Sequence, residues 1–117
     1  MNAYAHIDMS TYSDLQATVG AEFVGELIDT YCEETPRLLL ELQAALSCGE
    51  TEAFRRAAHS IKSSSASLGA LPLAALAREL EGLGREGRMD EAPPRMEPLR
   101  TAYLETERAL RELQHAT

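Results

Sequence analysis

The sequence predicts an all-α protein, namely an antiparallel four-helix bundle with a short extra N-terminal helix and a kinked second helix. No stretch alternates apolar and polar residues with a period of two, and valine occurs only twice. The helix formers Ala, Leu, Glu and Arg dominate instead. Apolar residues recur at helical spacing in four segments that Gly and Pro separate. Such narrow apolar stripes are stable only when they pack against one another, which favours a bundle.

The length and charge limit the classes of protein that fit. The 117 residues suit one domain, with a lead-in and a short helix over residues 1–19 and the bundle over about 20–115. The net charge of −8 makes nucleic acid and anionic membrane surfaces poor partners. The same charge, together with the lack of a surplus apolar stripe, favours a monomer.

The first two helices are expected on either side of Gly20. Ser13-Asp14 can open a short helix that ends before this glycine. A longer segment, 21–47, follows, and Gly49 suits its end. Thr35-Pro36 interrupts that segment, which predicts either a kink or a restart with Thr35 as N-cap. The expected apolar face of the long segment comprises Phe23, Leu27, Tyr31, Leu38, Leu42 and Leu46.

The remaining three helices are predicted from their capping residues. Thr51 is the expected N-cap of a helix that runs to about Leu68 and stops at Gly69. Pro72 fits the first turn of the next helix, and Pro93-Pro94 begins the last one. The expected buried residues are Leu73, Leu76, Leu80 and Leu83 in the fourth helix, and Met96, Leu99, Tyr103, Leu110 and Leu113 in the last.

Cysteine and histidine usage points to a reduced compartment. Cys32 and Cys48 are sixteen residues apart at apparently apolar helical positions, so both are expected as buried free thiols. His6, His59 and His115 lack partners at metal-ligand spacing, and no resident metal is expected. The first ten residues have neither the basic start nor the apolar run of a signal peptide. The expected location is the cytoplasm.

His59 is the candidate functional residue because its helix should present it to solvent. At about 100° per residue, this histidine lies about 140° away from Phe54, which is on the core face. The expected core face is Phe54, Ala57, Ala58, Ile61, Ser65 and Leu68. The neighbours of His59 one turn away are cationic or small, namely Arg55, Arg56, Lys62 and Ser63, with Ala66 one turn further on.

The charge pattern around His59 favours an anionic ligand. The 26 residues between Glu52 and Glu79 contain no acid, although the chain has nineteen Asp and Glu residues. That stretch contains Arg55, Arg56, Lys62 and Arg78. An imidazole nitrogen without a proton is a nucleophile, and nearby cations stabilise a group with about two negative charges. Phosphoryl acceptance on His59 fits, with Lys62, Arg55 and Arg56 stabilising the phosphate.

This interpretation makes two demands. Because the stretch offers no carboxylate for Mg²⁺, the metal is expected from a partner. In addition, the imidazole must project away from the bundle interior, with no carboxylate from another helix folded over it.

The segment AHSIKSSSASLGA, residues 58–70, resembles the signature of histidine-containing phosphotransfer (Hpt) domains. The resemblance extends to a Glu33, Pro36, Leu39, Leu42 pattern in the long helix and to Leu80-Glu81 after the motif. It implies a four-helix bundle in which His59 accepts the phosphoryl group and Lys62 contacts it. Ser64, Ser65, Gly69 and Ala70 would shape the helix and its end.

The same resemblance implies the partners and one departure. Hpt domains carry phosphate between receiver-domain aspartates of response regulators and hybrid sensor histidine kinases, without kinase or hydrolase activity of their own. The family usually has glycine where this chain has Ser63. Serine is still small, so access of the partner past Ser63 and Ala66 is expected to survive, and the hydroxyl is a candidate hydrogen-bond donor to the imidazole or phosphate.

Two alternatives belong to other classes. A helical adaptor would dock a receiver domain without exchanging phosphate, and His59 would then be incidental. An independent enzyme using His59 fits less well, because the sequence places no carboxylate, cysteine or second histidine to orient it and contains no nucleotide-phosphate motif.

Overall fold

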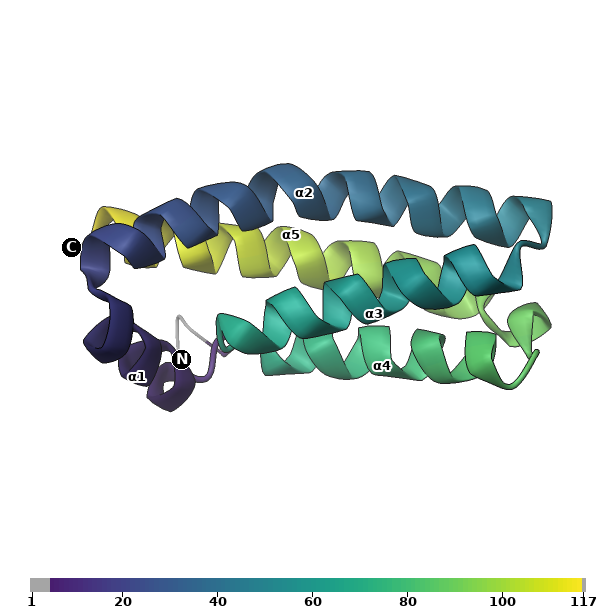
Figure 1. Cartoon of the computed structure of the whole chain (residues 1–117), viewed down its shortest axis with the longest axis horizontal. Coiled ribbons are helices and arrows are strands. Elements are labelled where there is room, and N and C mark those ends of the chain that lie inside the picture. The colour runs from purple at the N-terminus through teal and green to yellow at the C-terminus, as the bar shows by residue number, and fades with distance from the viewer. Residues whose placement is uncertain (1–4, 117) are drawn as a thin grey trace.

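The computed structural model describes residues 5–116, which form an elongated bundle of four long helices with a short helix at one end (Figure 1). Within this part of the chain there is no strand, so the all-α expectation is confirmed. The elements in chain order are α1 (Met9–Val19), α2 (Ala21–Cys48), α3 (Thr51–Ser67), α4 (Leu71–Arg85), the 3₁₀ helix η1 (Met89–Glu91) and α5 (Pro93–His115).

Two predicted helix starts need correction. α1 begins at Met9 rather than near Ser13, because the Asp8 carboxylate caps it by accepting a hydrogen bond from the Thr11 backbone N–H at 3.0 Å. At α3 the N-cap position is Glu50, and Thr51 is the first helical residue. The proline-initiated starts of α4 and α5 are as predicted.

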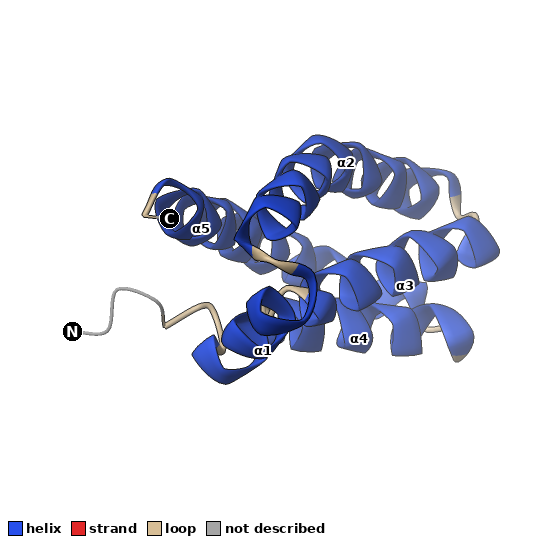
Figure 2. Cartoon of the chain, turned by 60° about the vertical axis from the view of Figure 1, so that its left-hand side comes forward, coloured by secondary structure: helices blue, strands red, loops and turns tan. Residues whose placement is uncertain are grey.

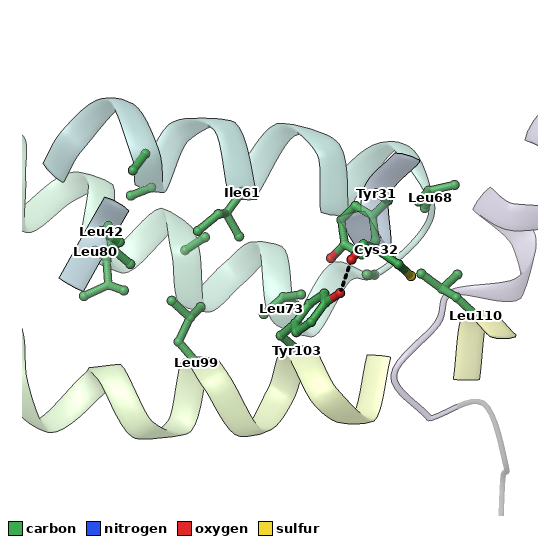
Figure 3. Close-up of a cluster of buried hydrophobic side chains, with 14 of the residues drawn as sticks. Tyr31, Cys32, Leu42, Ile61, Leu68, Leu73, Leu80, Leu99, Tyr103 and Leu110 are labelled. Carbon is green, nitrogen blue, oxygen red and sulfur yellow. Dashed lines mark hydrogen bonds between the residues drawn. The ribbon is translucent and has the colours of Figure 1, made fainter. Parts of the chain in front are cut away.

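α2 runs unbroken through Pro36 as a gently curved helix, so the expected restart with Thr35 as N-cap is wrong. A proline cannot donate to the carbonyl four residues earlier, which belongs to Cys32. In the fold, the Tyr103 hydroxyl of α5 donates to this Cys32 carbonyl oxygen at 3.4 Å (Figure 3). A buried side chain from another helix thus donates to the carbonyl oxygen that Pro36 cannot bond. The helix can therefore continue through Pro36 without leaving a buried acceptor unsatisfied.

The core lies along the shared axis of α2, α3, α4 and α5, and two sequence assignments to it are wrong. Phe23 is 48% exposed, because Val24 and Ile28 face the interior in this part of α2. Cys48 is exposed at the end of α2, whereas Cys32 is buried. The predicted core residues of α5 are all buried, and in α4 only Leu76 is half-buried instead.

α1 covers the end of the bundle where α3 turns into α4 (Figures 1 and 2). The Asp8 backbone N–H donates to the Gly69 carbonyl oxygen at 2.7 Å. Gly69 has a φ of 85°, and a Cβ there would lie 2.8 Å from the Asp8 carbonyl oxygen. Glycine is therefore needed at this position both to end α3 and to let α1 dock against the loop.

None of the helices in the described part of the chain combines the length and the apolar character that crossing a lipid bilayer requires.

Candidate functional site

His59 lies on the outward face of α3, as expected. Its side chain is 53% exposed, whereas all six residues assigned to the core face of this helix are buried. The helical period alone places the imidazole there, because His59 lies outside the stripe that packs against α2 and α4.

A buried carboxylate from α4 holds the inner side of the imidazole. Glu81 is only 3% exposed, and its Oε2 lies 2.7 Å from His59 Nδ1. Its other oxygen, Oε1, lies 2.7 Å from Lys62 Nζ, and Arg85 adds a longer contact of 3.4 Å to Oε2. One carboxylate thus bridges the histidine and the lysine of α3, with each oxygen assigned to a different partner.

The close packing of α3 against α4 brings Glu81 to this position. Gly84 lies one turn further along α4, and a Cβ there would be 3.2 Å from both Arg55 Cβ and the Phe54 ring. Because the two helices run antiparallel, contact of Gly84 with the start of α3 sets the carboxylate of Glu81 opposite His59, one turn along. A glycine in α4 therefore helps to set the distance at which this carboxylate reaches α3.

The bridge determines which imidazole nitrogen keeps its lone pair on the exposed side. The hydrogen bond from Lys62 holds the pKa of Glu81 below its usual 4.5 against the opposing effect of burial, and His59 adds to the lowering. The ionised carboxylate can only accept, so Nδ1 carries the proton of the neutral ring. Nε2 then keeps its lone pair on the exposed side, where the Ser63 hydroxyl oxygen lies 3.5 Å away.

Glu81 corrects the expectation that no carboxylate from another helix contacts the ring. That condition was too strict, because an imidazole has two nitrogens and a carboxylate on one leaves the other accessible. Sequence reasoning missed Glu81 because it lies outside the acid-free stretch. The available signal was a charged residue next to Leu80 on the buried stripe of α4, which indicates a carboxylate held by a cation from a facing helix.

The predicted cations are less concentrated around His59 than the sequence suggested. Lys62 is in place, but its charge is shared with Glu81. Arg55 forms an ion pair with Glu52, and Arg56 is exposed. Arg78 lines a hollow on α4 with residues such as Gly82 and Arg95.

The motif residues after Lys62 divide into structural and surface positions. Ser65 is fully buried and shares a hydrogen bond of 2.7 Å with the Tyr31 hydroxyl of α2, so its role is to join two helices and not to give access. Ser64 donates to the Ser60 carbonyl oxygen at 2.9 Å. Ala66 is half-buried, and Gly69 serves the docking of α1.

An apolar groove adjoins the exposed face of α3 on the side of α1 and α2. It has a volume of about 250 Å³, and its walls are mostly apolar. Its lining comprises Leu15, Leu27, Thr30, Tyr31, Glu34, Ser64, Ser67 and Leu68. At about 100° per residue, Ser64 and Ser67 of the groove lie about 140° and 80° around α3 from His59, so one partner surface laid across this helix can contact both.

The lowered pKa of Glu81 predicts an acid-sensitive contribution to stability. A carboxyl group whose folded pKa lies below its unfolded value stabilises fully above the unfolded pKa and loses this as the pH falls towards the folded value. We expect Glu81→Gln to lower the free energy of unfolding by about 1–2 kcal/mol at pH 7, since Lys62 and His59 remain partly solvated. The deficit should shrink below about pH 5.

Urea unfolding of both proteins between pH 7 and pH 3 measures that deficit. Glu79→Gln is the matched control, because Glu79 lies on the same helix but is 59% exposed. A deficit for Glu81→Gln that stays constant down to pH 3 would contradict the assigned direction of the pKa shift.

Comparisons with known proteins agree with this fold. The family model described as "Hpt domain" matches residues 26–116. Among solved structures, the chain is similar to the crystal structure of histidine-containing phosphotransfer protein B from Pseudomonas aeruginosa PAO1. The TM-score is 0.89 at 29% sequence identity, and the alignment covers 97% of each chain. No curated protein matches the sequence.

Proposed function

The chain belongs to the Hpt domain family and acts in histidine phosphotransfer within two-component signalling, and we propose that His59 is its phosphoryl acceptor. His59 receives the group on Nε2 from a receiver-domain aspartyl phosphate and passes it to the aspartate of a second receiver. The observation that carries this assignment is the asymmetric imidazole, with Nδ1 bonded to buried Glu81 and a ring that is 53% exposed.

Glu81 assists the transfer through Nδ1, the imidazole nitrogen on the inner side of the ring. When the P–O bond of the aspartyl phosphate breaks and the Nε2–P bond forms, the ring takes on positive charge. The carboxylate at 2.7 Å from Nδ1 stabilises that charge and fixes the ring orientation, so the in-line approach needs no rearrangement. Glu81 is thus a positioning residue, and His59 is the residue that bonds to phosphorus.

Charge on the phosphoryl oxygens is neutralised from both sides of the interface. Lys62 lies one turn from His59 and can turn from Glu81 towards the phosphate. Arg55 and Arg56 are the further candidates on α3. Since the nearest carboxylate already bonds to Lys62 and His59, the Mg²⁺ that phosphoryl transfer requires is supplied by the acidic pocket of the receiver.

The receiver docks across the exposed face of α3 and reaches the apolar groove at α1 and α2. This groove and Nε2 flank the same row of small residues, so a single surface can seat on the groove while it presents its aspartate to His59. A small, transient interface suits a carrier that must release each partner. The carrier itself is a cytoplasmic monomer without kinase or hydrolase activity.

Thr30→Glu tests this docking surface. Thr30 is exposed on α2 and lines the groove, so a charged side chain there should reduce the rate of transfer from a phosphorylated receiver about fivefold to tenfold. Labelling of His59 by phosphoramidate, a small phosphoryl donor, should be unchanged because it needs no docking. Thr101→Glu adds the same charge at an exposed position of α5 that does not line the groove, which makes it the matched control. Equal transfer rates in the two variants would exclude the groove as the docking site.

Phosphotransfer itself is tested with a receiver labelled on its aspartate in the presence of Mg²⁺. The proposal predicts that label appears on this protein in an acid-labile, base-stable form, as expected for a phosphoramidate bond, and then passes to an unlabelled receiver. Binding of the receiver without movement of label would instead support the adaptor function.

A further inference from the structure

Ser63 differs from Ser64, Ser65 and Ser67 of α3 in where its hydroxyl points. Ser64 and Ser67 donate to backbone carbonyl oxygens one turn earlier, at 2.9 and 3.0 Å. Ser65 is buried against Tyr31. The Ser63 hydroxyl oxygen instead lies 3.5 Å from His59 Nε2, on the exposed surface where a phosphoryl group would be attached.

The direction of this interaction follows from Glu81. Because Nδ1 donates to Glu81, Nε2 of the neutral ring can only accept, and Ser63 is the donor. At 3.5 Å the bond is long and therefore weak, so it costs the nucleophile little. Once Nε2 bonds to phosphorus, its lone pair is used, and the hydroxyl is left beside a group with three anionic oxygens.

The hydroxyl therefore interacts more strongly with the phosphorylated state than with the free one. A hydrogen bond from a hydroxyl to an anionic oxygen is shorter and stronger than one between neutral groups. The cation of Lys62, by contrast, is already engaged by Glu81 at 2.7 Å and must be shared. An interaction that favours one of two states shifts the equilibrium between them by its difference in free energy.

We propose that Ser63 is a positioning residue that donates its hydroxyl to a phosphoryl oxygen on His59 and thereby shifts the phosphotransfer equilibrium towards this protein. The inference rests on the proposed function of His59. The Ser63 hydroxyl would stabilise the phosphorylated state of His59, which a glycine at the same position could not do because it has no side-chain donor.

Ser63→Ala tests the proposal because it removes the hydroxyl and keeps the Cβ and the helix. With a receiver and Mg²⁺, the equilibrium ratio of phosphorylated His59 to phosphorylated receiver should fall about threefold to tenfold. Ser63→Thr retains a hydroxyl and should restore most of the ratio. Ser60→Ala is the matched control, since Ser60 is exposed on the same helix and does not line the groove, and it should stay within about twofold of the wild type.

A second measurement needs no partner. Protein labelled on His59 with phosphoramidate is titrated by ³¹P NMR, and a hydroxyl donor should lower the pKa of the phosphoryl group by stabilising its dianion. The midpoint should therefore be higher in Ser63→Ala than in the wild type or Ser60→Ala. An unchanged midpoint overturns the proposal, whatever the equilibrium ratio does. If no variant exchanges label with any receiver, the proposed function fails instead, while the titration still decides the role of Ser63.

Discussion

Replacing His59 by glutamine is expected to abolish receiver-dependent phosphorylation, with a loss of about a thousandfold or more in the rate of labelling. Removal of the atom that bonds to phosphorus leaves no alternative acceptor, and losses of this size are usual when a nucleophile is removed. The fold should persist, because the side chain is 53% exposed and Lys62 still holds the buried Glu81 carboxylate. Helicity by circular dichroism and label incorporation on the same sample separate the two effects.

His115→Gln provides the matched control for this substitution. His115 is an exposed histidine in the last turn of α5, at the far end of the chain from the motif. Its replacement should leave the labelling rate within about twofold of the wild type. Label that persists in His59→Gln would place the phosphoryl group elsewhere and end the assignment of His59.

Replacing Glu81 by glutamine is expected to slow phosphotransfer about tenfold to a hundredfold. Partners that orient a functional histidine typically contribute a factor of this size. Glutamine keeps the shape of the side chain but loses the negative charge that stabilises the positive ring and fixes the proton on Nδ1. The loss should appear with phosphoramidate as well as with a receiver, because Glu81 acts on the imidazole and not on docking.

The comparison with Glu79→Gln isolates the role of Glu81 in the transfer. Both residues lie on α4, and Glu79 pairs with Arg95 at 3.6 Å, away from His59. In addition, ¹⁵N NMR of the imidazole should show the proton on Nδ1 in the wild type and a shift in the balance of the two tautomers in Glu81→Gln. If Glu81→Gln kept a normal transfer rate and an unchanged tautomer, Glu81 would contribute to the structure but not to phosphotransfer.

Local sequence rules succeeded where one segment decides the outcome. The outward direction of His59 follows from the helical period, because the buried stripe of six residues leaves the imidazole on the opposite side. Pro72, Pro93 and Gly69 mark helix ends because their backbone preferences act within one turn. At Pro36 the same rules wrongly allowed a restart of the helix, because the Tyr103 hydroxyl from α5 supplies a hydrogen bond that the sequence of α2 alone does not show.

The sequence by itself determined the helical class, the bundle and the identity of the candidate nucleophile, since each depends on spacing within a helix or on a local motif. Only the tertiary structure decided which nitrogen of His59 is presented, because the partner of Nδ1 is Glu81 on a different helix, 22 residues away. It also decided how much charge Lys62 offers, since the same carboxylate binds it. The strength of each charge interaction depends on the distance between the helices that carry the charges. For His59 and Lys62 this distance depends on how closely α3 and α4 pack at Gly84, and the order of charges along the sequence does not show it.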